Sequence, residues 1–158
     1  PPADPAALGA RLLAENRPDL ALDAFERAIA AGDGPEALTG AAIALLRLGR
    51  GGEARRLLET ALAREPDLPA ARNALGVAHH EAGRYEAALA EFRRSDELTG
   101  GGDPSIAFNI GVAETALAAR EGRQAELDGF DYDVIQYGNG VYRLTPRARG
   151  SAREEESR

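Results

Sequence analysis

The 158-residue sequence contains no cysteine, methionine, tryptophan or lysine, and only four tyrosines and four phenylalanines. Without cysteine, the chain cannot form disulfides, thiolate metal sites or cysteine nucleophiles. With so few aromatic residues, its core must be built mainly from alanine and leucine, whose small average size lets helices approach closely. A β-sandwich would call for more β-branched and aromatic residues. The composition therefore favours stacked helices.

The formal net charge of −7 argues against nucleic acid or an anionic membrane surface as the main partner. No apolar run approaches the ~18 residues that a membrane-spanning helix needs. The sequence begins with Pro1 in place of methionine, which predicts a processed or trimmed N-terminus. A signal peptide or lipid anchor would then have been lost with the upstream segment.

A repeat of about 34 residues runs through most of the sequence, with successive copies 33 to 35 residues apart. Its clearest copy contains Leu75-Gly76 and then Ala88-x3-Phe92. The corresponding residues of the other copies are Leu8-Gly9 with Ala21-x3-Phe25, Ala41-Ala42 with Ala54-x3-Leu58, and Ile110-Gly111. Each copy is long enough for two helices joined by a short turn.

The positions of small and large residues predict how the two helices of a copy pack. The small residue of the first helix, such as Gly76, is expected where that helix passes close to the second. A small and a large residue four places apart, such as Ala88 and Phe92, share one face of the second helix. A proline near the first turn of each first helix costs no hydrogen bond. The expected helices cover residues 4–15, 19–31, 35–48, 52–64, 69–82, 85–98 and 104–120.

This pattern resembles the tetratricopeptide repeat (TPR) family, which reads W-x2-L-G-x2-Y, then A-x3-F, then a proline. The resemblance covers residues 3 to about 121, although the tryptophan position never holds tryptophan and Ala42 replaces one glycine. It implies an all-α, right-handed αα solenoid of about three and a half repeats in residues 1–121. It also implies a scaffold without catalytic activity or cofactor that binds another protein or peptide.

After residue 121 the period changes from 3.6 to 2, which predicts a short linker and a β-hairpin in residues 122–145. Asn139-Gly140 is typical of a two-residue type I′ turn. With these as the central residues, Tyr137 would pair with Tyr142 and Ile135 with Leu144, all on one apolar face. Residues 146–158 are rich in arginine, serine and glutamate and are expected to be a disordered tail.

Two compatible roles are expected for the hairpin. Because an isolated hairpin is only marginally stable in water, it is expected to pack on the open end of the repeat stack as a cap. In its second role, its free edge or its tyrosine face would recruit a partner by strand addition. The residues expected to make such a contact are Ile135, Tyr137, Tyr142 and Leu144.

In the TPR family, particular faces of the first helices line a groove, and the resemblance carries these positions to this sequence. The residues expected to form a partner-binding groove are Ile43, Leu46, Arg47, Asn73, Val77, His80, Glu81, Phe108, Asn109 and Val112, with Thr39, Gly40 and Ala74 on the same wall. Such a mostly apolar lining favours an amphipathic helix or an extended apolar peptide. An alternative is that Ile43 and Val77 only pack between repeats.

The family also includes a version that clamps a C-terminal carboxylate with lysine, asparagine and arginine residues. We reject that role, because the chain has no lysine and because Ala10 and Val77 occupy the places expected for the clamp asparagines.

Metal binding and catalysis are not expected. His79 and His80 are adjacent, so they point about 100° apart on a helix and cannot hold one ion together. Asp128, Asp131 and Asp133 lack the glycine and closing glutamate of a calcium loop. Residues 100–103 lack the Lys-Ser/Thr of a phosphate loop. We therefore predict no metal, no cofactor and no enzymatic activity.

Short bacterial TPR chains rich in alanine and arginine, with a trimmed N-terminus, resemble the TPR lipoproteins of tight-adherence (Tad/Flp) pilus systems. This resemblance implies a pilus or secretion assembly factor that acts on a secretin, located in the bacterial periplasm or at the inner face of the outer membrane as a lipoprotein. One alternative is a cytoplasmic TPR chaperone of a secretion system. A second alternative is a non-catalytic regulatory subunit of an enzyme.

Overall fold

The computed structural model describes residues 4–120, 130–137 and 141–148. The first range forms seven α-helices, each within one residue of the expected bounds, which confirms the predicted helical repeats. They are α1 (Pro5–Ala14), α2 (Pro18–Ala30), α3 (Pro35–Arg47), α4 (Gly51–Arg64), α5 (Pro69–Glu81), α6 (Tyr85–Leu98) and α7 (Pro104–Arg120).

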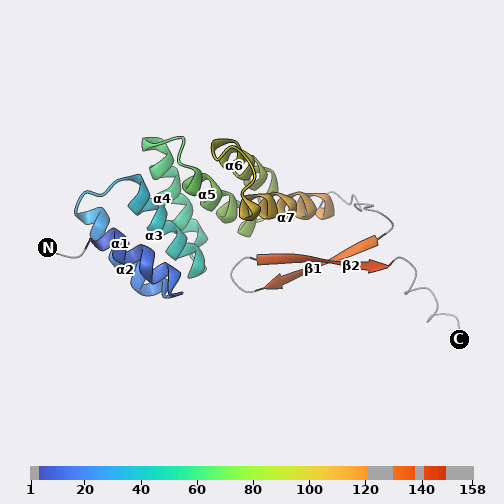
Figure 1. The fold of residues 1–158 in the computed structure, drawn as a ribbon, viewed down its shortest axis with the longest axis horizontal. Coiled ribbons are helices and arrows are strands. Elements are labelled where there is room, and N and C mark those ends of the chain that lie inside the picture. The colour runs from blue at the N-terminus through green and yellow to red at the C-terminus, as the bar shows by residue number, and fades with distance from the viewer. Residues whose placement is uncertain (1–3, 121–129, 138–140, 149–158) are drawn as a thin grey trace, which may run out of the picture.

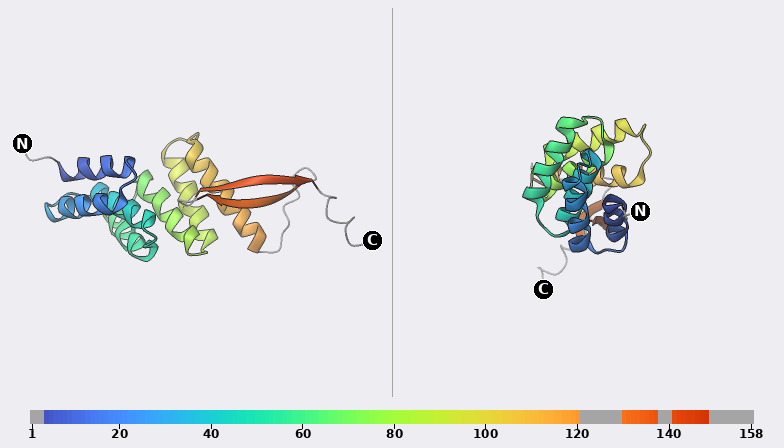
Figure 2. Two further views of the ribbon diagram at one scale, coloured as in Figure 1. Left: turned by 90° about the horizontal axis from the view of Figure 1, so that it is seen from below. Right: turned by 90° about the vertical axis from the view of Figure 1, so that its left-hand side faces the viewer.

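The helices form an elongated stack of antiparallel pairs (Figures 1 and 2). Each helix contacts the next one along the chain, and the first helices of successive repeats, α1, α3, α5 and α7, also contact one another in turn. Contacts of this kind join only neighbouring repeats, as expected of a solenoid. One cluster of buried residues extends from α1 to α5, and a second joins α6 to α7.

Left-handed backbone conformations end the first helix of each complete repeat. Asn16, Gly49 and Gly83 have φ angles of 55°, 73° and 72°. In the third repeat, the N–H of Arg84 donates to the carbonyl of His79 at 2.9 Å, and the first two repeats make the equivalent bond. This 6→1 hydrogen bond is the Schellman motif, which uses a carbonyl that the helix leaves free. The motif reverses the chain and makes each pair antiparallel.

Two phenylalanine rings lie against glycines of the first helices. A Cβ atom on Gly76 would lie 2.4 Å from the ring of Phe92, so only glycine fits there. Phe25 is enclosed from two sides, since a Cβ atom would lie 2.8 Å from its ring at Gly9 and 2.3 Å at Gly40. Gly9 belongs to the same repeat as Phe25 and Gly40 to the next. The Phe25 ring therefore joins two repeats.

The last helix, α7, begins a fourth unit. Its Ile106 and Ala113 are buried, while Phe108 remains 40% exposed. A Cβ atom on Gly111 would have no neighbour within 4 Å, in contrast to Gly76 one repeat earlier. In the described part of the chain, α7 thus lacks the second helix that accompanies α1, α3 and α5.

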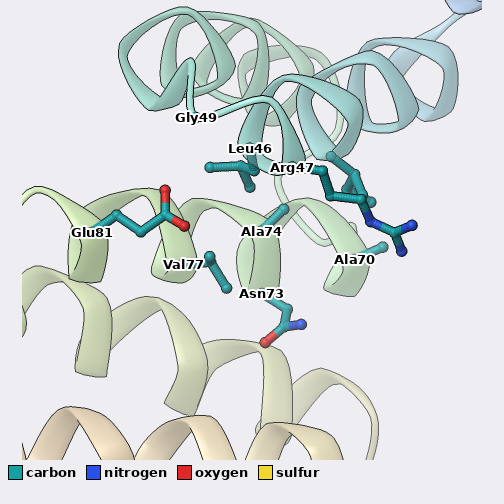
Figure 3. Close-up of a pocket in the computed structure, with 9 residues that line it drawn as sticks. Leu46, Arg47, Gly49, Ala70, Asn73, Ala74, Val77 and Glu81 are labelled. Carbon is teal, nitrogen blue, oxygen red and sulfur yellow. The ribbon is translucent and has the colours of Figure 1, made fainter. Parts of the chain in front are cut away.

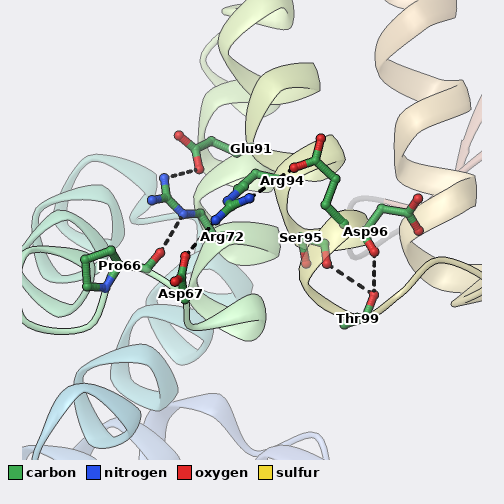
Figure 4. Close-up of polar contacts among 9 residues, drawn as sticks. Pro66, Asp67, Arg72, Glu91, Arg94, Ser95, Asp96 and Thr99 are labelled. Atoms are coloured by element: carbon green, nitrogen blue, oxygen red, sulfur yellow. Dashed lines mark hydrogen bonds and ion pairs between the residues drawn. The ribbon is translucent and has the colours of Figure 1, made fainter.

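Arginines tie the loop between α4 and α5 to α6 (Figure 4). Arg72 donates to the carbonyl of Pro66 at 3.1 Å and pairs with Glu91 at 2.9 Å. Arg94 pairs with Asp67 at 2.8 Å. Both partners of the Arg72–Glu91 pair are largely buried, so solvent screens this pair less than the others.

Two strands follow the helices, β1 (Phe130–Tyr137) and β2 (Val141–Ala148), and they pair antiparallel. Strand β2 continues through residues 146–148, so the expectation that the disordered tail begins at 146 is wrong there. Pro146 pairs with Tyr132. A proline is tolerated because each strand of a two-stranded sheet has a free edge. Residues 149–158 of the expected tail lie outside the described residues.

The pairing register differs by one residue from the expected one. Tyr137 lies opposite Val141, and Ile135 lies opposite Arg143, so the predicted Tyr137–Tyr142 and Ile135–Leu144 pairs are wrong. Tyr142 lies opposite Gln136 instead, and Leu144 lies opposite Val134. The difference arises because three residues, 138–140, separate the strands, where a type I′ turn would use two. The turn itself lies outside the described residues.

Extensive contacts in the described ranges join helix to helix and strand to strand. Capping of the stack by β1 and β2 therefore stays a prediction.

Candidate partner-binding groove

A groove with a volume of about 420 Å³ lies between α3 and α5 (Figure 3). It is lined by Ile43, Leu46, Arg47, Gly49, Ala70, Asn73, Ala74, Val77 and Glu81. Ile43, Leu46 and Val77 are only partly buried, so their side chains face a space that no helix of the described chain fills. The surface is apolar in its middle, and the side chains of Arg47 and Glu81 lie at opposite ends.

Arg47 is held in place by the preceding repeat. Its guanidinium donates to the carbonyl of Leu13 at 2.6 Å. Leu13 lies in the last turn of α1, where its carbonyl also accepts from the N–H of Asn16 at 3.1 Å and where a positive charge is favoured. This bond spans one repeat and fixes the direction of the Arg47 side chain.

Glu81 occupies the position of Arg47 one repeat later, but its surroundings differ. Its carboxylate makes no hydrogen bond or ion pair with the described residues. A Cβ atom on Gly51 would lie 3.5 Å from its Oε2 atom, which places the carboxylate beside the start of α4. Although the residue remains solvent accessible, partial burial raises the pKa of the Glu81 carboxyl.

A family model described as tetratricopeptide repeat matches residues 7–55 and 39–103. The chain belongs to the tetratricopeptide repeat family. TPR repeats typically mediate protein–protein interaction and are generally non-catalytic. No curated protein matches the sequence.

Solved TPR structures share this fold. The first TPR domain of human RPAP3 is 22% identical with a TM-score of 0.69, and the match covers 75% of this chain and 93% of that one. A thermophilic TPR protein of Thermus thermophilus, TTC0263, is 28% identical with a TM-score of 0.67, covering 77% and 68%. The first TPR of Spaghetti (RPAP3), bound to the HSP90 peptide SRMEEVD, is 22% identical with a TM-score of 0.66, covering 72% and 90%.

Most of the groove residues expected from the TPR pattern lie together. Those that line the groove are Ile43, Leu46, Arg47, Asn73, Val77 and Glu81. Gly49 and Ala70 also line it but were not expected, since neither occupies a wall position of the family pattern. Ile43 and Val77 also pack against the two buried clusters, so they have both a packing role and a groove position. Their contact with a partner stays a prediction.

Four expected groove residues lie outside the groove. Asn109 donates to Asn73 at 3.1 Å and so adjoins it. His80 packs its ring against Tyr85, with 5.2 Å between ring centroids. Phe108 is exposed on α7, and Val112 is half-buried there.

The expected wall positions Thr39 and Gly40 are buried and do not face the groove. Thr39 donates its hydroxyl to the carbonyl of Pro35 at 2.8 Å. Gly40 receives the ring of Phe25. At Gly40 the prediction from the family pattern is wrong because α3 presents this residue to Phe25 of the preceding repeat.

In the described residues, no helix is long and apolar enough to span a membrane. The same part of the chain contains no cluster of three or more histidine or acidic side chains arranged to hold a metal ion.

The two histidines of α5 predict a pH-dependent stability. Burial lowers the pKa of both His79 and His80, and for His79 the positive charge of Arg84 adds to this effect. The unfolded chain then binds more protons than the folded one just below the ordinary histidine pKa of about 6.5. The contribution of the two neutral histidines to stability is fully present above that pH. It is lost as the pH falls through 6.5 toward the lowered pKa values of the folded state.

We expect the melting temperature to fall from pH 7.5 to 5.5, and to fall less in a His79→Gln/His80→Gln variant, as measured by circular dichroism. Glu81→Gln is the control. Burial raises the pKa of the Glu81 carboxyl, so this group favours folding as the pH falls, and removing it should not reduce the fall in melting temperature. Equal losses in the wild-type chain and the double histidine variant would contradict the assignment.

Proposed function

We propose that this TPR protein binds a segment of a partner protein in the groove between α3 and α5. The observation that carries the proposal is the partly exposed apolar surface formed by Ile43, Leu46 and Val77. Burial of such a surface on binding is favourable by about 25 cal/mol per Å². An amphipathic helix or an extended apolar peptide has the apolar side chains to cover it.

The size of the groove limits what it holds. A volume of about 420 Å³ accommodates a few side chains and not a folded domain. On a helix, residues at i, i+3 and i+4 would point into it together. Asn73, at the groove wall, is already bonded to Asn109, so it adds a polar edge of fixed orientation.

A bound peptide in a related fold supports this mode of recognition. The Spaghetti TPR carries an HSP90 peptide. At 22% identity that structure shows a shared fold, which in that protein binds a peptide, and it says nothing about the sequence of this protein's ligand. We do not propose an HSP90-type peptide, because lysine is absent and Val77 stands where a clamp asparagine is expected.

For the biological setting, we propose a bacterial envelope assembly such as a pilus or secretion machine, with a secretin or similar component as partner. The alanine- and arginine-rich repeats support this proposal. A cytoplasmic secretion chaperone is the alternative, and a non-catalytic regulatory subunit of an enzyme is a second. The N-terminus of the complete gene product tests the compartment: a signal peptide with a lipobox cysteine favours the envelope, and a plain methionine start favours the chaperone.

The groove is tested with matched substitutions. Ala70 lines the groove and Ala90 lies on the outer face of α6, and both are exposed, so Ala70→Asp and Ala90→Asp should both fold. A partner identified by affinity capture is then titrated against each variant by calorimetry. We expect Ala70→Asp and Val77→Asp to weaken binding about tenfold or more, since each places an unpaired carboxylate against an apolar ligand. Ala90→Asp should bind as the wild type does.

Unchanged binding by both groove variants would overturn the proposal and direct attention to β1 and β2, whose free edges offer strand addition.

A further inference from the structure

The two charged residues of the groove are equivalent in the repeat but not in their bonding. One N–H of the Arg47 guanidinium donates to the carbonyl of Leu13, which fixes the direction of the side chain and leaves its positive charge in place at its own end of the groove. Glu81 has no such partner in the described chain. Among the described lining residues, the charged side chain that has no bond within the chain is therefore negative.

Among the residues that the structure describes, the surroundings of Glu81 supply no cation. The loop beside its carboxylate contains Gly49 and Gly51, which carry no side chain. Arg50, between them, is held by Glu53 through two hydrogen bonds of 2.8 and 2.7 Å. The neighbouring His80 packs on Tyr85, and burial lowers its pKa, so it is neutral at pH 7.

A partly desolvated carboxylate at the end of an apolar groove is stabilised when a ligand brings a positive charge to it. The overall charge of the chain has the same sign, with a formal net charge of −7, so its field also attracts a basic segment. Charge complementarity thus points to one kind of occupant.

We infer that the groove selects a partner segment whose apolar side chains cover Ile43, Leu46 and Val77 and whose lysine or arginine pairs with Glu81. This inference rests on the proposed function. It adds the sign of the charge that the partner segment carries and the orientation in which the segment binds. The basic residue lies at the Glu81 end of the groove, and an acidic residue is disfavoured there.

A display selection provides the test. Random twelve-residue peptides on phage are selected against the wild-type chain, Glu81→Gln, Glu81→Lys and Val77→Asp. Glu81 is exposed, so its variants should keep the wild-type circular dichroism and melting behaviour. This is checked first, and it is checked for Val77→Asp as well, because Val77 packs against a buried cluster. We expect wild-type selections to be enriched in lysine or arginine next to apolar residues. Selections on Glu81→Lys should replace these basic residues by aspartate or glutamate.

One synthetic peptide from the wild-type selection is then titrated. Its affinity should fall about two- to fivefold for Glu81→Gln, the range expected of a solvent-accessible charge pair. Added salt should weaken binding to the wild type more than to Glu81→Gln.

Wild-type selections without basic residues, or the same sequences from Glu81→Lys, would overturn the inference. The Val77→Asp selection separates this failure from failure of the groove itself. If Val77→Asp loses the peptides while both Glu81 variants retain them, the groove function stands and the charge assignment falls. If Val77→Asp retains the peptides, both fall.

Discussion

Replacing Phe92 by alanine is expected to lower the free energy of unfolding by about 3–5 kcal/mol, the usual cost of emptying a phenylalanine site in a core. Phe92 is 2% exposed and belongs to the cluster that joins α6 to α7. Its ring lies against Gly76, so the vacated space borders a helix backbone that cannot easily move inward. Chemical denaturation followed by circular dichroism measures the loss.

A double-mutant cycle identifies the contact responsible. Gly76→Ala alone should destabilise the chain, since the new Cβ atom would lie 2.4 Å from the Phe92 ring. In the Phe92→Ala background the same methyl group enters vacated space, so the two losses should not add. Gly111→Ala is the matched control: nothing lies within 4 Å, and alanine in a helix is favoured over glycine by roughly 0.5–1 kcal/mol. Additive losses at Gly76 and Phe92 would rule out the packing described.

Substitution of Gly40 by alanine should have the next largest effect, a loss of about 1–3 kcal/mol from overpacking. The added Cβ atom would lie 2.3 Å from the ring of Phe25, and Gly9 blocks the ring on its other side. The ring therefore has no direction in which to retreat, and the first repeat must separate from the second.

The loss at Gly40 should be local, because each repeat contacts only its neighbours. Hydrogen exchange of Gly40→Ala should speed up in α1 and α2 and stay nearly unchanged in α5 and α6. Gly52→Ala serves as control, since a Cβ atom there meets nothing within 4 Å. A uniform increase of exchange across all helices would contradict a local effect.

The helices were predictable because sequence repeats and end signals agree with each other. A proline at the start of each first helix, and Asn16, Gly49 or Gly83 after the end of α1, α3 and α5, fix these boundaries locally. The contact between Gly40 and Phe25 was not predictable in this way. It joins two repeats, so it depends on the rotation between successive helix pairs, which a pattern within one repeat does not contain.

The groove was predicted in part for the same reason. The family pattern identifies one face on every first helix, and between α3 and α5 those faces enclose a common space. It does not indicate that His80 turns to Tyr85 or that Thr39 turns into the core. The different bonding of Arg47 and Glu81 also depends on the carbonyl of Leu13, which only the stacked structure brings within reach. The predicted register of the two strands was wrong by one residue, because three residues rather than two separate β1 from β2.

Because contacts in the helical part join only adjacent units, the length of this protein is not fixed by its fold. A duplicated copy of residues 35–68 would find, on each side, a surface like the one its parent already meets. Growth or loss of whole units therefore disturbs little of the remaining chain, whereas gain or loss of a few residues breaks every following contact. Such a molecule can change its reach in steps of one helix pair while keeping an existing recognition surface intact.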